Sequence, residues 1–221
     1  MFEARSRRCD GIALKYRLIL SDVDSTLIEN EVIDLLGAYT NQGDVVATIT
    51  ERAMRGEIDF QTALRDRVRV LAGLSADVIP EVAQKISFSP GALELRQYCL
   101  SIGVKFGAVT GGFKQVLDEL PFFRSLDHLK ANSLEIEDGV LTGEVLGDIV
   151  DRSEKARQLV EFATQEGIPM EETIAIGDGA NDLEMIERAG LGVAYRGKEI
   201  LRKRADLSLE NTLAELIPYL N

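Results

Sequence analysis

The sequence predicts an α/β protein, with a Rossmann-like parallel sheet as its core and a small four-helix cap inserted after the first strand. Short apolar runs of strand length alternate with segments of helical periodicity, and this alternation is typical of a parallel sheet covered by helices on both faces. One long segment has helical periodicity and no strand signal, which predicts the insertion. The 221 residues, 45% of them apolar, are enough for one core domain with such an insertion.

The core elements are predicted from the apolar pattern. Buried strands are expected at four short apolar runs: Leu18–Leu20, Val104–Val109, Thr173–Ile176 and Leu191–Ala194. Helices are expected at four segments with helical spacing: Ala92–Leu100, Glu154–Gln165, Leu183–Arg188 and Leu213–Leu220. Between Leu134 and Leu146, Asp138-Gly139 separates two alternating segments, which predicts a β-hairpin.

The insertion is expected between residues 31 and 88. Its apolar residues recur at three- and four-residue intervals, and glycines and a proline separate the pattern into four helices. Ser89-Pro90-Gly91 marks the return to the sheet, with Pro90 suited to a helix start. The predicted organisation is therefore a tail at 1–16, an α/β core at 17–30 and 89–221, and a helical cap at 31–88.

Composition and charge narrow the function classes. Lys and Arg number 25 against 37 Asp and Glu, a net charge of −12, so we expect no nucleic-acid or membrane partner. There is no run of 18 apolar residues and no signal peptide is apparent, which leads us to expect a cytoplasmic protein. Cys9 and Cys99 do not form a CxxC pair and are expected to be free thiols. His128 is the only histidine, so any metal should have oxygen ligands, which favours magnesium.

Polar motifs follow three of the predicted strands: Asp22-Val23-Asp24, Thr110-Gly111-Gly112 and Gly177-Asp178-Gly179-Ala180-Asn181-Asp182. The carboxyl ends of parallel strands lie at one edge of the sheet, so four carboxylates should converge there. Their mutual repulsion would be severe without a cation, and Mg²⁺ suits such an all-oxygen set. Any one of these aspartates alone could be a turn residue or a helix cap. Three such loops at three strand ends favour a functional site.

Together with Ser25-Thr26, Phe113 and Lys155, these motifs resemble the four signatures of the haloacid dehalogenase-like phosphatases. The signatures occur in the family's order, and the resemblance covers nearly the whole chain from about residue 17. They are most similar to the branch of that family that acts on phosphoserine. The resemblance implies Mg²⁺-dependent hydrolysis of O-phospho-L-serine to L-serine and phosphate through an aspartyl-phosphate, the last step of serine biosynthesis.

The resemblance also implies a role for each signature residue. Asp22 would be the nucleophile, and Asp24 would protonate the leaving oxygen and then deprotonate the attacking water. Asp22, the backbone carbonyl of Asp24, and Asp178 would hold the Mg²⁺, with Asp182 supporting the ion or its water. The phosphoryl oxygens would be bound by Thr110, Gly111, Gly112, Lys155 and Asn181. Serine is commoner than threonine at the position of Thr110, but the hydroxyl is kept.

Four positions of the insertion match substrate contacts of the family: Glu31, Met54, Phe60 and Arg67. Glu31 would bind the substrate ammonium, and Arg67 would bind the carboxylate with two hydrogen bonds. Met54 and Phe60 would form an apolar wall that excludes water. Structural roles are the alternatives: Glu31 as a first-turn helix acid, Arg67 in an exposed charged run, and the two apolar residues in a core.

Other functions remain open at this stage. A phosphotransferase on the same scaffold could pass the phosphoryl group to another alcohol such as homoserine, and a related phosphatase could act on a different small phosphoester. A signalling receiver domain also combines acidic residues, a threonine and a lysine on a parallel sheet, but it has no helical insertion and no second acid for turnover. The sequence leaves a monomer and a homodimer equally open.

Overall fold

The computed structural model describes residues 14–40, 43–54 and 57–220. Within these residues the core is a seven-stranded sheet in the order β4-β3-β2-β1-β5-β6-β7. Its strands are β1 (Leu18–Ser21), β2 (Lys105–Phe113), β3 (His128–Glu137), β4 (Val140–Leu146), β5 (Thr173–Gly177), β6 (Leu191–Tyr195) and β7 (Leu207–Leu209). Neighbouring strands are parallel except β3 and β4, which form an antiparallel hairpin. This mostly parallel α/β sheet confirms the predicted fold class.

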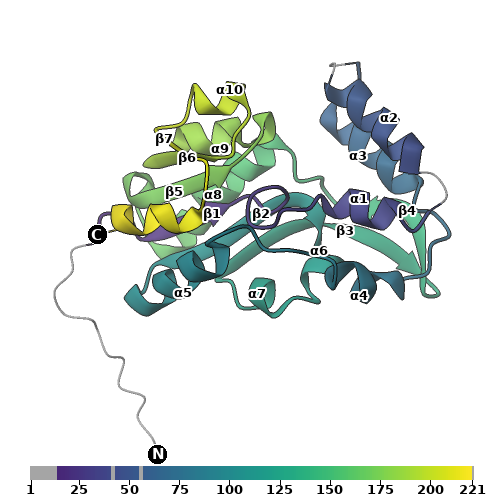
Figure 1. The fold of residues 1–221 in the computed structure, drawn as a ribbon, viewed down its shortest axis with the longest axis horizontal. Coiled ribbons are helices and arrows are strands. Elements are labelled where there is room, and N and C mark those ends of the chain that lie inside the picture. Colours follow the sequence, from purple (N-terminus) through teal and green to yellow (C-terminus); the bar gives the residue numbers. More distant parts are fainter. Residues whose placement is uncertain (1–13, 41–42, 55–56, 221) are drawn as a thin grey trace, which may run out of the picture.

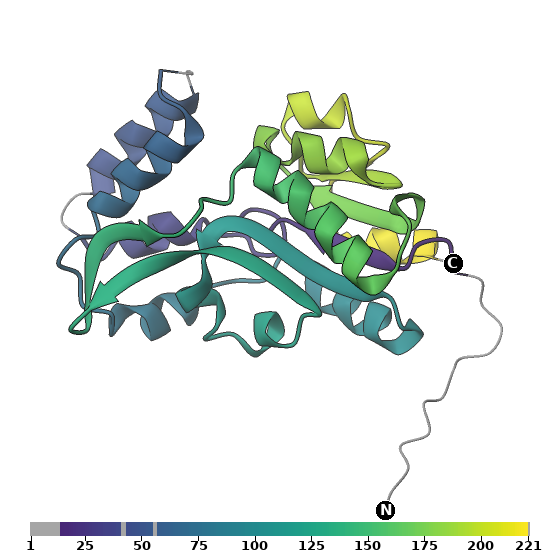
Figure 2. The same cartoon turned by 180° about the vertical axis from the view of Figure 1, so that it is seen from behind.

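Helices cover both faces of the sheet, as Figures 1 and 2 show. One face carries α8 (Arg152–Glu166), α9 (Leu183–Arg188) and α10 (Glu199–Arg202), and the other carries α5 (Ala92–Ile102), α6 (Lys114–Leu117), α7 (Pro121–Arg124) and the 3₁₀ helix η3 (Leu213–Leu220). The central strand β1 is buried on both faces: Leu18 and Leu20 pack in the core beneath α8 and α9, and Ile19 packs in the opposite core. An uninterrupted apolar run is therefore what this strand requires.

The predicted insertion is helical over its described segments, which form α1 (Val32–Gly37), α2 (Gly43–Met54), α3 (Phe60–Arg69) and α4 (Val78–Ala83). In Figure 1, α2 and α3 lie side by side and project away from the sheet, whereas α1 and α4 lie along the core. An antiparallel bridge between Ile28 and Phe88 joins the two chain segments where the insertion leaves and returns. Asp59 begins α3 by accepting a hydrogen bond from the backbone N–H of Thr62 at 2.9 Å.

Two local predictions are corrected and a third is confirmed. The strand β2 continues through Thr110-Gly111-Gly112 to Phe113; its pairing with β3 shifts register between Val109 and Phe113, and Asn132 of β3 donates to the Gly111 carbonyl at 2.8 Å within this irregular segment. Pro90 does not start α5, since the N-cap is Gly91 in a left-handed conformation (φ 79°) and Pro90 precedes it. The last predicted helix is present with the expected bounds, Leu213–Leu220, and it is a 3₁₀ helix that contains Pro218.

The remaining small predictions concern the cysteines and the histidine. Cys99 is a free, buried thiol in α5, and Cys9 lies outside the described residues. The His128 ring stacks on Phe162 with centroids 4.3 Å apart, and its Nε2 lies 3.1 Å from Glu166 Oε1, so this histidine is a packed residue at the start of β3. Among the described residues, no helix is long and apolar enough to cross a membrane.

Candidate active site

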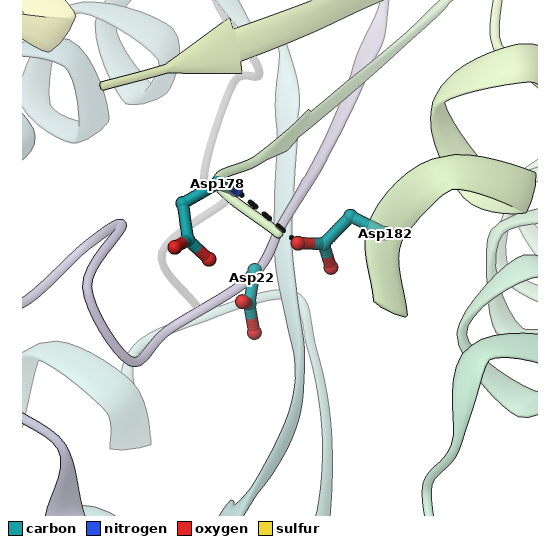
Figure 3. Close-up of side chains that lie close together, drawn as sticks. All are labelled: Asp22, Asp178 and Asp182. Atoms are coloured by element: carbon teal, nitrogen blue, oxygen red, sulfur yellow. Dashed lines mark hydrogen bonds between the residues drawn. The ribbon is translucent and has the colours of Figure 1, made fainter. Parts of the chain in front are cut away.

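Three aspartates meet at the carboxyl edge of the sheet (Figure 3). Asp22 directly follows β1, and Asp178 and Asp182 follow the neighbouring strand β5. One carboxylate oxygen from each lies within 4.8 Å of the others. The backbone N–H of Asp22 donates to the Ile176 carbonyl at 2.8 Å, so the strand pairing itself brings the two acidic loops together. Three of the four carboxylates that were predicted to converge therefore lie together, and the fourth, Asp24, has other partners.

A buried lysine lies between two of these acids. Lys155, in the first turn of α8, places its Nζ 2.7 Å from Asp22 Oδ1 and 2.7 Å from Asp182 Oδ1. Burial alone would lower the pKa of Lys155, but the charges of Asp182 and Asp22 outweigh it and raise that pKa above its usual value. The ammonium is therefore a fixed positive charge at the centre of the site.

Asp182 is held by donors on both of its carboxylate oxygens. Oδ1 accepts from Lys155, while Oδ2 accepts from the backbone N–H groups of Asp178 at 3.2 Å and Gly179 at 3.1 Å. Gly177 makes this geometry possible, because a Cβ there would lie 2.4 Å from Asp182 Cγ. With its oxygens engaged in this way, Asp182 is placed to orient its neighbours.

Asp24 points into a different part of the site. Its Oδ1 accepts from the backbone N–H of Val32 at 2.9 Å, and its Oδ2 accepts from the Thr110 hydroxyl at 2.8 Å. Burial, followed by the nearby charge of Glu31, raises the pKa of Asp24 to about 6. A carboxyl group in that range can both give and take a proton near neutral pH. Gly112 packs against it, since a Cβ on Gly112 would lie 2.6 Å from Asp24 Oδ2.

The structure brings residues of the insertion to the same place. A cavity of about 720 Å³ is lined by the acids Asp22, Asp24 and Asp178, by Thr110, Gly111, Gly112 and Asn181, and by Glu31, Phe60 and Arg67. The Phe60 ring covers Gly111, where a Cβ would approach Phe60 Cζ to 3.1 Å. Burial lowers the pKa of Arg67, whose Nε donates to the Ala63 carbonyl at 3.3 Å. Met54 ends α2, and its side chain lies outside the described parts of the structure.

A hydrogen bond joins α3 to the start of α8. Gln61 Nε2 donates to Asp151 Oδ2 at 2.7 Å. Asp151 is also the N-cap of α8, and its Oδ1 accepts from the backbone N–H of Glu154 at 3.0 Å. The insertion therefore contacts the core directly at the helix that carries Lys155.

Sequence reasoning missed several residues at this site. Arg152 and Lys198 add positive charge to the cavity wall, and Lys198 Nζ lies 4.0 Å from Asp178 Oδ2. The Ser25 hydroxyl donates to Glu31 Oε1 at 2.8 Å. Arg152 and Lys198 lie outside the recognised motifs, and Ser25 was named only as part of a motif, so the spatial arrangement is what reveals their contacts.

The acidic cluster fits a metal ion. Asp22 and Asp182 share the buried ammonium of Lys155, and Asp178 has only the exposed Lys198, 4.0 Å away, as a cationic neighbour. Burial and then the charge of Asp182 raise the pKa of Asp22 well above its usual value and that of Asp178 to about 6. A hard divalent cation with oxygen ligands would relieve this repulsion. Asp22 and Asp178 have the oxygens to hold it, and Asp182 would orient them.

The fold and this constellation define a family. A family model described as haloacid dehalogenase-like hydrolase matches residues 19–187. The chain belongs to the haloacid dehalogenase-like hydrolases, as its sequence motifs predict.

Several similar proteins carry the name of one activity. The chain is 48% identical to phosphoserine phosphatase SerB2 of Mycobacterium tuberculosis over 204 residues, covering 92% of this chain and 50% of the relative. It is 46% identical to the phosphoserine phosphatase of Streptococcus thermophilus over 205 residues, covering 92% of this chain and 95% of the relative. A solved phospho-aspartyl intermediate analogue of phosphoserine phosphatase superposes with a TM-score of 0.85 at 36% identity, over 94% of this chain and 100% of that one. The chain spans about half the length of the first curated relatives that it matches.

Proposed function

We propose that this protein is a phosphoserine phosphatase, which hydrolyses O-phospho-L-serine to L-serine and phosphate with the help of Mg²⁺. The observation that carries the proposal is that one cavity joins the strand-end acids to Glu31 and Arg67. Phosphoserine has an ammonium and a carboxylate beyond its phosphate, and Glu31 and Arg67 offer the complementary charges. The names of the curated relatives support the same substrate.

In the first step of the proposed reaction, an Asp22 oxygen attacks phosphorus and the bond from phosphorus to the serine oxygen breaks. Asp24 gives its proton to that oxygen, so L-serine leaves as an alcohol and an aspartyl-phosphate remains on Asp22. A pKa of about 6 for Asp24 supports this role, because a fraction of the enzyme then holds the proton near neutral pH.

In the second step, Asp24 takes a proton from a water molecule, which attacks the phosphorus. The bond between phosphorus and Asp22 breaks, and inorganic phosphate and the free carboxylate are released. Lys155, the Thr110 hydroxyl, the Gly111 and Gly112 backbone and the Asn181 amide would bind the phosphoryl oxygens. Mg²⁺, held by Asp22, Asp178 and the backbone carbonyl of Asp24, would supply positive charge to the phosphate when bound.

The insertion would act as a cap. We propose that residues 31–88 form a helical cap domain over a core made of 17–30 and 89–221, with 1–16 as a tail. Phe60, together with Met54, would close the cavity over the bound phosphate and exclude water. The proposed setting is the cytoplasm, where the enzyme would act as a monomer or homodimer on a small molecule, without a nucleic-acid or membrane partner.

Release of phosphate from a panel of substrates tests the function. O-Phospho-L-serine should be the best substrate among phosphoserine, phosphothreonine, phosphoethanolamine and 3-phosphoglycerate. Activity should disappear with EDTA, return with Mg²⁺, and be absent in Asp22→Asn. Equal use of phosphoethanolamine, which lacks the carboxylate, would contradict the role of Arg67, and full activity of Asp22→Asn would overturn the mechanism.

The role of Arg67 has its own control. Arg67→Ala should raise KM for phosphoserine about tenfold or more while changing phosphoethanolamine much less, because only the first substrate offers a carboxylate. Arg69→Ala, two residues further along α3 and 58% exposed in its side chain, is the matched variant and should leave both substrates unaffected. An equal loss on both substrates in Arg67→Ala would indicate a structural residue.

A further inference from the structure

We propose that Ser25 is a positioning residue, which holds Glu31 so that its carboxylate can select a substrate ammonium. The inference rests on the proposed function, because it takes Glu31 as the ammonium ligand. Ser25 follows Asp24 directly and lies between the catalytic acids and the insertion.

The backbone of Ser25 requires an explanation. Its φ is 56°, in the left-handed region, and among the described residues only Asp138 and Arg196 are other non-glycine residues with positive φ. Glycine adopts this conformation freely, whereas a residue with a Cβ is strained there. If the position served only to turn the chain, glycine would be the better residue. A serine in this conformation therefore indicates that its side chain has a use.

The hydroxyl has a clear partner. Ser25 Oγ donates to Glu31 Oε1 at 2.8 Å, and the Ser25 N–H donates to the Asn30 carbonyl at 3.3 Å, which closes the loop between them. Glu31 is the N-cap residue of α1, but its side chain makes no capping hydrogen bond, and the residue is exposed. Within the part of the chain that the structure describes, Ser25 Oγ is the one hydrogen-bond donor that holds the Glu31 carboxylate. Without it, a long side chain at a helix start could sample several rotamers.

The position of Glu31 suits an ammonium next to the reacting oxygen. The backbone N–H of Val32, the next residue, donates to Asp24 Oδ1 at 2.9 Å, so Glu31 lies beside the acid that would protonate the leaving oxygen. In phosphoserine the ammonium is only two carbons from that oxygen. With Oε1 held by Ser25, the free Oε2 is left to accept from the ammonium.

The test compares two substrates that differ only at the group in question. 3-Phosphoglycerate keeps the phosphate and carboxylate of phosphoserine but has a hydroxyl in place of the ammonium. We expect Ser25→Gly to lower the ratio of kcat/KM for phosphoserine to kcat/KM for 3-phosphoglycerate about tenfold. The change should come from a higher KM for phosphoserine. In a Glu31→Ala background the same substitution should change the ratio less than twofold, because Ser25 acts through Glu31. Ser101→Gly, which removes an exposed serine hydroxyl of α5, is the control and should leave the ratio unchanged.

The outcomes distinguish a failure of the proposed function from a failure of the proposed role of Ser25. A wild-type enzyme that does not prefer phosphoserine over 3-phosphoglycerate refutes the proposed function. The role of Ser25 is refuted if Ser25→Gly keeps the wild-type ratio of kcat/KM values within twofold. It is also refuted if Ser25→Gly lowers that ratio equally in the wild-type and Glu31→Ala backgrounds. Ser25→Ala provides a second variant if the glycine variant does not fold, because it keeps the Cβ of the serine and removes only the hydroxyl that donates to Glu31. It should lower the ratio as Ser25→Gly does.

Discussion

Replacement of Lys155 by methionine should destabilise the protein far more than the loss of an ordinary lysine. The Lys155 ammonium is buried and lies 2.7 Å from both Asp22 and Asp182. Methionine fills a similar volume but leaves two buried carboxylates without their shared cation. Breaking such a pair costs about 3–5 kcal/mol. In a chain of 221 residues, each kcal/mol corresponds to about 2–4 °C, so we expect the melting temperature to fall by about 6–20 °C.

The assay is thermal unfolding by circular dichroism at pH 8 in EDTA. Lys203→Met is the matched control, because Lys203 pairs with Glu199 at 2.6 Å on the surface with its side chain 69% exposed, and such pairs are worth less than about 1 kcal/mol. Mg²⁺ should restore part of the loss in Lys155→Met, since a cation that binds the folded acids stabilises them. A melting temperature of Lys155→Met within about 3 °C of the wild type would show that charge does not hold this cluster together.

One further prediction concerns the close packing of Gly112 against Asp24, and another concerns the burial of Cys99. Gly112→Ala should lower kcat about 100-fold in a phosphate-release assay without loss of the fold, because the new methyl group would lie 2.6 Å from Asp24 Oδ2 and displace that carboxylate. Gly37→Ala is the control, since its new methyl group would meet Val46 at an ordinary 3.4 Å. Equal kcat values for the two variants would refute the reasoning. Burial raises the pKa of Cys99 to about 12, so below that pH the folded state disfavours its thiolate. In a Cys9→Ser background, Cys99 should therefore react with a thiol reagent at pH 8 about 1,000-fold more slowly than in guanidinium, and rapid labelling of the folded protein would contradict this prediction.

The sequence was most informative about the centre of the sheet. β1 and β5 are buried on both faces, so each appears as a continuous apolar run that can be recognised without knowing its partners. Elements of three or four residues, such as β7, α6 and α10, are too short to show a period and were not predicted. The extent of β2 was also misjudged, because its glycines suggest a turn, whereas the irregular pairing with β3 and the contact with Asn132 depend on the tertiary structure.

The site could be predicted as a set of motifs but not as a network. The parallel order of the strands was enough to bring Asp22 to Asp178, and the structure places them together. Lys155 lies between two acids, and the Thr110 hydroxyl donates to Asp24. Both contacts depend on side-chain geometry, which cannot be predicted from the order of the strands. The same holds for Ser25, whose left-handed backbone and contact with Glu31 appear only in three dimensions.

The shared use of Asp151 has a consequence for how such an enzyme could evolve. Its carboxylate begins the helix of Lys155 and also receives the amide of Gln61 from the insertion. If α3 moved outward to admit a larger substrate, Gln61 would therefore displace Asp151 and with it the first turn of α8, which carries Lys155. In the proposed mechanism Lys155 binds the phosphate, so a change of specificity through the insertion would also alter phosphate binding unless a compensating change near Asp151 separated the two effects.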